Sequence, residues 1–261
     1  MKTDSLTPYF SLLRQLITPA PDQRTWKKPA RLIPPGTLTC GCPRMPDKGR
    51  LWSLASMLPA AGTGSQQSPV DIFSDCEGPS SGLEFHYRSS HLNVEHTGFT
   101  AQVNYEQGSH ITLLGQSFQL VQFHFHTPSE HLMRGEALDM ELHLVHMDTE
   151  GRLAVVGVLF REGPPKDELD DILERIPPAP GQLDFPEITI RAEDFLPGER
   201  SFFTYMGSLT MLPYTEGVRW VVMKNQLTAS RAQIQRLEDI FGKTARAVQP
   251  LNGRKISCSI T

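Results

Sequence analysis

The sequence predicts a mainly β, α+β protein built on one large, mostly antiparallel sheet with short peripheral helices. From Leu83 onward, short segments rich in Val, Phe, Leu and Thr alternate with Gly, Asn and charged turns, which is the pattern of antiparallel strands. Few segments of the chain repeat apolar residues at helical spacing. With 261 residues, the chain fits one hydrophobic core with a short appendage.

Two segments have helical patterns. Residues 167–176 place four apolar residues at i, i+3, i+4 and i+7, after a Pro-Pro pair that can open a helix. Residues 230–241 have a similar apolar stripe. Ser230 and Gln233 have the spacing of a capping box, and Gly242 is placed to end the helix.

Four segments that matter for chemistry are predicted to be strands, namely 118–126, 139–147, 152–160 and 217–223. The third is apolar on both faces, which predicts a position in the middle of the sheet with both sides covered. A short turn at 148–151 joins the second segment to the third, so we expect these two strands to pair in antiparallel fashion.

The first part of the chain differs in composition from the rest. Residues 1–50 contain nine Lys/Arg and three Asp/Glu, a charge of +6, so a total of −4 leaves −10 for the rest of the chain. Eight of the 21 prolines also lie there. We interpret residues 1–49 as a proline-rich basic arm, either a leader or disordered, ahead of a catalytic domain at 50–261. An acidic domain gives no reason to expect a nucleic-acid partner.

The sequence shows no clear sign of export or membrane insertion. The apolar run Tyr9–Ile17 lacks the cleavage site of a secretory signal. No run approaches the roughly 20 apolar residues that cross a bilayer. The cysteines show no disulfide framework and no zinc-ribbon spacing; they are Cys40, Cys42, Cys76 and Cys258.

Three histidines are predicted to share one metal ion. Alternate side chains of a strand lie on the same face, so His124 and His126 face one side of the first strand segment. His143 has the matching position on the next. If the two strands pair with these faces aligned, three imidazoles converge. Three neutral imidazoles suit a tetrahedral Zn²⁺ and leave its fourth position open for water, which is typical of catalytic zinc sites.

Two polar residues support the metal interpretation. Gln122 and Glu141 each stand two residues before a histidine, on the same strand face, where each can accept the outer N–H of a metal-bound imidazole. The alternative is that the histidines are ordinary hydrogen-bonded residues, which suits a lone His. We apply that alternative to His131 and His146, which we expect to be structural.

Several blocks occur in an order that matches one enzyme family. They are Gln67–Ile72, Phe123–His126 with Ser129–His131, Glu141–His146, Gly207–Thr210, Glu216–Trp220 and Gln249–Arg254. Together they resemble the α-class carbonic anhydrases, and the Glu-Gly-Val start of the fifth block resembles bacterial members. The resemblance covers about residues 50–258.

The resemblance implies a fold, an activity and residue roles. The implied fold is a twisted, mostly antiparallel ten-stranded sheet with zinc at the base of a conical cavity. The implied activity is reversible hydration of carbon dioxide to bicarbonate and a proton by zinc-bound hydroxide. By resemblance, Thr210 accepts the hydroxide proton and donates its own to Glu130, while His131 supports the site. The implied substrate pocket is apolar and consists of Val145, Val155, Leu209, Met211, Val218 and Trp220.

Three positions depart from the family. Phe99 stands where many members carry a proton-shuttle His, and a phenyl ring cannot relay a proton. We therefore expect proton transfer to buffer to limit turnover, unless His91, His96 or a water chain compensates. Met211 and Leu212 replace the usual Thr and Pro, so we expect altered affinity for anions and inhibitors.

Other functions stay open at this point. A catalytically weak binding module would lose zinc ligands, and a structural zinc site would need a fourth protein ligand; neither pattern is present. The resemblance implies carbon dioxide and bicarbonate, sulfonamides and inhibitory anions as partners, and bacterial members suggest a homodimer. It favours the periplasm or secretion, whereas the missing signal and disulfide patterns favour the cytoplasm.

Overall fold

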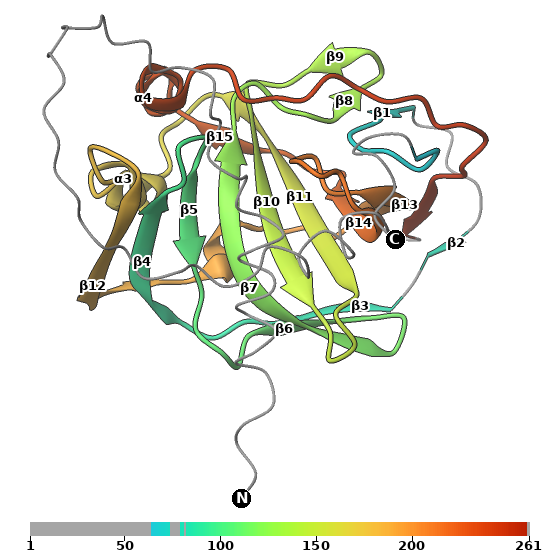
Figure 1. Ribbon diagram of the computed structural model, residues 1–261, viewed down its shortest axis with the longest axis horizontal. Coiled ribbons are helices and arrows are strands. Elements are labelled where there is room, and N and C mark those ends of the chain that lie inside the picture. Colours follow the sequence, from blue (N-terminus) through green and yellow to red (C-terminus); the bar gives the residue numbers. More distant parts are fainter. Residues whose placement is uncertain (1–63, 74–78, 81, 260–261) are drawn as a thin grey trace, which may run out of the picture.

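One large twisted sheet dominates the computed structural model of the chain, which describes residues 64–73, 79–80 and 82–259 (Figure 1). Ten strands follow one hydrogen-bonded path: β12 (Gly181–Ile190), β4 (Ser90–His96), β5 (Ala101–Asn104), β7 (Gln116–His126), β10 (Met140–Met147), β11 (Leu153–Glu162), β14 (Glu216–Met223), β13 (Phe202–Ser208), β16 (Ser257–Ser259) and β2 (Pro79–Ser80). This path agrees with the ten strands expected. The predicted arm at 1–49 lies outside the described residues.

The remaining strands lie beside this path. β15 (Leu227–Ala229) pairs with β11, and β3 (Leu83–His86) pairs with β6 (His110–Leu113), which pairs with β7. A small separate sheet contains β1 (Asp71–Ile72), β8 (Leu132–Met133) and β9 (Glu136–Ala137). In the large sheet, neighbours are antiparallel except for β14 and β15 on β11, and β2 on β16. The predicted fold class is confirmed.

The strand predicted to lie mid-sheet is β11. It pairs with β10 on one side and β14 on the other, and residues 153–160 are buried throughout. Such a position explains why this segment is apolar on both faces, since neither face meets water. The predicted antiparallel pair of β10 and β11 is also confirmed, with the turn closed by a bond from the Gly151 N–H to the Asp148 carbonyl.

The two faces of the sheet have different roles. Phe123, Phe125 and Leu142 belong to a large apolar cluster on one face, which is also packed by the two helices α3 (Asp167–Leu173) and α4 (Arg231–Phe241). Strand alternation therefore sends the histidines of β7 and β10 to the other face. The helices cover the apolar face, and the opposite face is left for a site.

The helix α4 agrees with its prediction, but α3 is shorter than predicted. Ser230 accepts from the backbone N–H of Gln233, whose side chain returns the bond in a capping box. α3 ends at Leu173 rather than at residue 176. The backbone N–H of Arg175 bonds three residues back, so the last turn tightens, and the following Pro-Pro pair cannot continue the helix. A single 3₁₀ turn, η2 (Ala192–Phe195), was not predicted.

The cysteine prediction was wrong in one respect, because Cys258 in β16 is disulfide-bonded. The other three cysteines lie outside the described residues. Cysteine spacing could not reveal this bond, since a disulfide depends on which residues come close in the folded chain. In the part of the chain described, no helix is long and apolar enough to span a bilayer.

His146 is a structural histidine, as expected. Its burial predicts that the free energy of unfolding depends on pH. It is fully buried, and its Nε2 lies 2.8 Å from the Tyr87 hydroxyl. Burial lowers the pKa of His146 from 6.5 to about 3. Because folding favours the neutral ring, the stabilisation is present above pH 6.5 and is lost as pH falls towards 3.

We expect His146→Gln to flatten the pH dependence of the unfolding free energy of the metal-free chain between pH 6 and pH 4. The difference in slope from wild type should be about 1.4 kcal/mol per pH unit, the value for one proton. Urea unfolding at several pH values measures it. His86→Gln is the control, since the side chain of His86 is 44% exposed. Parallel profiles for wild type and His146→Gln would contradict the assignment.

Candidate metal centre

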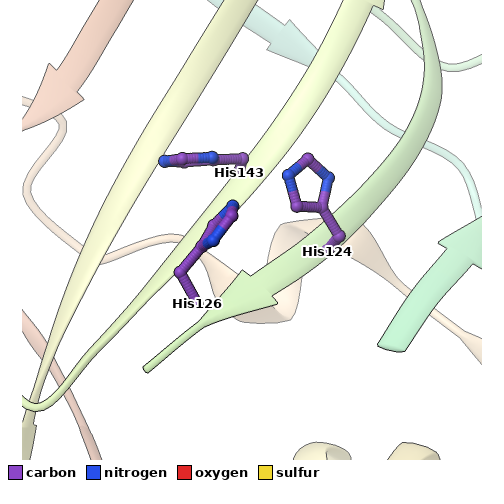
Figure 2. Close-up of side chains that lie close together, drawn as sticks. All are labelled: His124, His126 and His143. Atoms are coloured by element: carbon purple, nitrogen blue, oxygen red, sulfur yellow. The ribbon is translucent and has the colours of Figure 1, made fainter. Parts of the chain in front are cut away.

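Three imidazoles converge on the face of the sheet opposite the helices (Figure 2). β7 and β10 pair in antiparallel fashion with His124 directly opposite His143. The ring centroids are 5.1 Å apart for His124 and His126, 5.3 Å for His124 and His143, and 4.7 Å for His126 and His143. One ring nitrogen of each lies within 4.8 Å of the others. The convergence predicted from strand alternation is therefore present in the structure.

The outer nitrogens of the rings have hydrogen-bond partners, which sets the direction of the inner ones. His124 Nδ1 lies 2.9 Å from Gln122 Oε1, and His143 Nε2 lies 2.9 Å from Glu141 Oε1. Each partner oxygen accepts an N–H, so His124 Nε2 and His143 Nδ1 keep their lone pairs.

The third ring shows the same arrangement. His126 Nδ1 lies 3.4 Å from the Thr244 hydroxyl, and its Nε2 is buried without any hydrogen-bond partner among the described residues. A buried imidazole nitrogen without a partner is costly unless something fills the space that it faces. Together with one ring nitrogen each of His124 and His143, which lie within 4.8 Å, this nitrogen fits a divalent metal that prefers imidazole, and Zn²⁺ is the common one.

The charges of the site suit metal binding. Burial lowers the pKa of His124 well below its usual value, and the rings of His126 and His143 lower it further. Burial also lowers the pKa of His126. Burial opposes the charged form of His143 too, but the carboxylate of Glu141 outweighs it and raises that pKa. His124 and His126 are thus held in the neutral form that coordinates metals.

The Glu141 side chain in β10 links this strand to the loop that precedes β8 by hydrogen bonds. Its Oε2 accepts the backbone N–H groups of Glu130 and His131, each at 2.8 Å, and its Oε1 accepts from the rings of His131 and His143. Burial alone would raise the pKa of Glu141, but the two histidines outweigh it and hold the pKa well below the usual value. The site therefore contains a buried carboxylate with four donors around it.

A second close group, His131 with Glu141 and His143, is a hydrogen-bonded cluster and not a metal site. His131 donates its Nδ1–H to Glu141 at 2.7 Å, and its Nε2 lies 2.7 Å from the Tyr205 hydroxyl. Every nitrogen of His131 is thus used, which agrees with the structural role predicted for it. Gly157 lies opposite His143, and a Cβ there would come within 2.9 Å of Glu141 Oε1. Only glycine leaves room for this carboxylate.

Thr210 and Glu130 both lie at the site. Thr210 is 8% exposed and lines the pocket in front of the rings. Glu130 is buried; its Oε1 accepts the backbone N–H of Arg246 at 2.9 Å. Glu130 Oε2 is buried and without a partner among the described residues, and no hydrogen bond to Thr210 is present there. The two residues are near the rings, as the resemblance implied, but the hydroxyl–carboxylate bond is not formed.

The pocket in front of the imidazoles is small, about 20 Å³. Its apolar wall agrees with the expected one except at one position. It is lined by Gln122, His124, His143, Val145, Val155, Leu209, Thr210, Met211 and Trp220. Val218 is not part of this wall. It packs in the apolar cluster behind the wall instead, with 1% of its surface exposed.

Comparison with known proteins decides the family. Residues 47–260 match the eukaryotic-type carbonic anhydrase family. The chain belongs to this family. A carbonic anhydrase of Nostoc sp. is 41% identical over 199 residues, which cover 74% of this chain and 75% of that protein. The predicted enzyme class is confirmed at this level, and zinc-dependent hydration of carbon dioxide is the general activity of the family.

Solved carbonic anhydrases have the same fold. A hyperthermostable carbonic anhydrase from an active hydrothermal vent chimney has a TM-score of 0.73 and 40% identity, and the match covers 76% of this chain and 89% of that one. The α-carbonic anhydrase of Thermovibrio ammonificans, in complex with the inhibitor sulfanilamide, has a TM-score of 0.72 and 37% identity, with 74% and 87% covered.

Phe99, which the family resemblance places at the position of the shuttle histidine, is exposed, with 51% of its surface accessible. His96 points to the helix-covered face, where its ring lies 4.7 Å from that of Phe241. His91 lies between two carboxylates, 3.1 Å from Glu106 and 2.8 Å from Asp184. His96 is thus turned to the helix-covered face, whereas both ring nitrogens of His91 face carboxylates.

Several residues of this carbonic anhydrase's site were not found from the sequence. Tyr205 supports His131, and Thr244 faces His126. Arg246 bonds the carbonyl of Ser68 at 2.6 Å and stacks on the ring of Tyr214, 3.5 Å from its centroid. The hydrogen-bonded partners His131, His126 and Ser68 are more than 70 positions away from these residues, and no motif spacing marks them. Only the folded sheet brings them to the site.

We expect Glu141→Gln to weaken zinc binding by about 10- to 100-fold, the usual effect of losing a group that orients a metal-bound histidine. An amide can accept from His143, but its NH₂ cannot accept the two backbone N–H groups that Glu141 accepts. Competition with a chelator measures the affinity, and circular dichroism checks folding. Glu84→Gln, at a side chain that is 67% exposed, is the matched control. Equal zinc affinities for Glu141→Gln and wild type would rule out this role.

Proposed function

We propose that the chain is a zinc-dependent carbonic anhydrase that binds Zn²⁺ through His124 Nε2, His126 Nε2 and His143 Nδ1. The observation that carries the proposal is that one ring nitrogen of each histidine lies within 4.8 Å of the others, while the remaining ring nitrogens face Gln122, Thr244 and Glu141. Bound zinc would lower the pKa of a coordinated water to about 7, the magnitude known for carbonic anhydrases, and so supply a nucleophile at neutral pH.

The other residues of the site would position the substrate. Carbon dioxide is apolar, and Val145, Val155, Leu209 and Trp220 offer an apolar wall beside the three nitrogens. Trp220 is held in place by a bond from its Nε1 to the Ser208 carbonyl at 2.9 Å. In this proposal, the Thr210 hydroxyl accepts a hydrogen bond from the nucleophile and donates one to Glu130, whose Oε2 has no hydrogen-bond partner among the described residues.

The experiment that tests the proposal combines metal analysis with a stopped-flow assay. The zinc-loaded chain should contain one zinc ion and hydrate carbon dioxide, and sulfanilamide should inhibit it, as that compound is bound in the relative's structure. His124→Ala should lose both zinc and activity. Zinc bound without hydration would favour a binding module instead. A chain that stays metal-free in excess zinc would end the proposal. The homodimer suggested by bacterial relatives stays a prediction.

We further propose that export of the proton limits turnover, since Phe99 cannot relay it, His96 is turned to the other face and His91 is held between two carboxylates. Phe99→His should raise the rate in weak buffer by at least about tenfold, because a positioned proton-transfer group typically contributes about 10²- to 10⁴-fold. Added imidazole should raise the wild-type rate and affect Phe99→His less. Phe99→Ala is the control, because it removes the ring without adding a base. A wild-type rate indifferent to imidazole would refute the limitation.

Met211 should set the affinity for anions. It lines the pocket, and Met211→Thr would add a hydroxyl donor there. We expect thiocyanate to inhibit Met211→Thr about three- to tenfold more tightly, as one extra hydrogen bond contributes about 0.5–1.5 kcal/mol, with little change in turnover. Leu212→Thr is the matched control, since this neighbour is 52% exposed and does not line the pocket. Unchanged inhibition in Met211→Thr would contradict this role.

A further inference from the structure

Another cavity, of about 470 Å³, is larger than the metal pocket and lies at the C-terminal end of β11. Residues of β1, of β8 and β9 with the turn between them, of β11 and β13, and of the segment that follows β14 line it; Figure 1 shows where these elements lie. Gly157 of β11 lies opposite His143, and Arg161 at the cavity is four residues further along. At the rise of an extended strand, this separates the cavity from the metal centre by roughly 13 Å.

Three cations from separate elements line this cavity: Arg134, Arg161 and Lys224. Among the described residues, none of the three has a carboxylate oxygen within 4.0 Å. Arg161 uses only its Nε, which donates to Gln226 Oε1 at 2.5 Å. Lys224 Nζ lies 5.2 Å from the ring centroid of Phe203 and 3.5 Å from the Ser259 carbonyl. Most of their donors are therefore available to a ligand.

This clustering is unexpected for the domain. The chain has a net charge of −4, and residues 1–50 contribute +6, so the remainder sums to −10. Many cations of the domain pair with nearby acids, as Lys166 does with Glu168 and Arg175 with Asp171. Three unpaired cations around one cavity create a local positive potential, which favours an anionic ligand.

The other lining residues restrict the kind of anion. Met133, which is half-buried, and Phe203, which is 6% exposed, form an apolar floor, and the fully buried Ile72 packs beneath it. An inorganic anion would leave this floor unused. Glu136 also lines the cavity, and its carboxylate would repel a second negative charge on the ligand. The lining thus suits one negative charge attached to an apolar body.

We propose that this cavity binds a small organic monocarboxylate. Its carboxylate would lie among Arg134, Arg161 and Lys224, with charge-assisted hydrogen bonds to the guanidinium groups. Its apolar body would lie on Met133 and Phe203. The site does not depend on the proposed metal chemistry, because it shares no lining residue with the metal pocket.

Isothermal titration with benzoate tests the proposal on zinc-loaded protein saturated with sulfanilamide, which keeps benzoate away from the metal. One benzoate should bind. Arg134→Gln and Arg161→Gln should each weaken binding about five- to tenfold, as expected for one lost charge-assisted bond. Arg236→Gln is the matched control, since this exposed residue of α4 does not line the cavity. Benzamide, the neutral analogue, should bind at least tenfold more weakly than benzoate.

Three results would overturn the proposal. They are equal binding of benzoate and benzamide, tighter binding of inorganic phosphate than of benzoate, and an equal loss in Arg236→Gln and the two cavity variants. If sulfanilamide itself fails to bind, the metal proposal fails separately. The titration is then made on the metal-free chain with His124→Ala, where any benzoate bound reports the cavity alone.

Discussion

The pairing register of β7 and β10 is the constraint on which the site depends. It places His124 directly opposite His143 and His126 opposite Glu141. A slip of one residue would turn His143 to the apolar face and Leu142 or Leu144 towards the pocket. Such a slip would bury an imidazole among Phe and Leu side chains and expose two leucines. The hydrophobic pattern of both strands therefore favours the one register in which the three rings converge.

Glu141 holds the ring of His143 in its position by hydrogen bonding. A buried carboxylate without partners is costly, whereas one with four donors stabilises the groups that donate to it. Through these bonds, the ring of His143, the ring of His131 and the backbone at 130–131 hold one another in place. His131 extends the network to Tyr205 in β13, whose hydroxyl lies 2.9 Å from Ser68 Oγ. Strand and loop residues far apart in sequence thus position one imidazole.

Two cavities with different linings lie along β11, one at the imidazoles and one at the cluster of cations. Near the middle of β10 and β11, neutral imidazoles meet an apolar wall, which suits a metal and a nonpolar substrate. At the end of β11, unpaired cations stand above an apolar floor that belongs to the same cluster as the wall of the metal pocket. The shared cluster supports both cavities, while the charge of the rim distinguishes what each can bind.

The sequence by itself determined the fold class, the four central strands, α4 and the three imidazoles, because each depends on local periodicity or on motif residues. Tertiary structure decided the rest. Thr244, Tyr205 and Arg246 reach the site only through long-range packing, and the packing of Val218 in the apolar cluster is likewise set by the folded sheet. Alternation tells which face a side chain takes, but only the folded sheet sets which distant residues share that face.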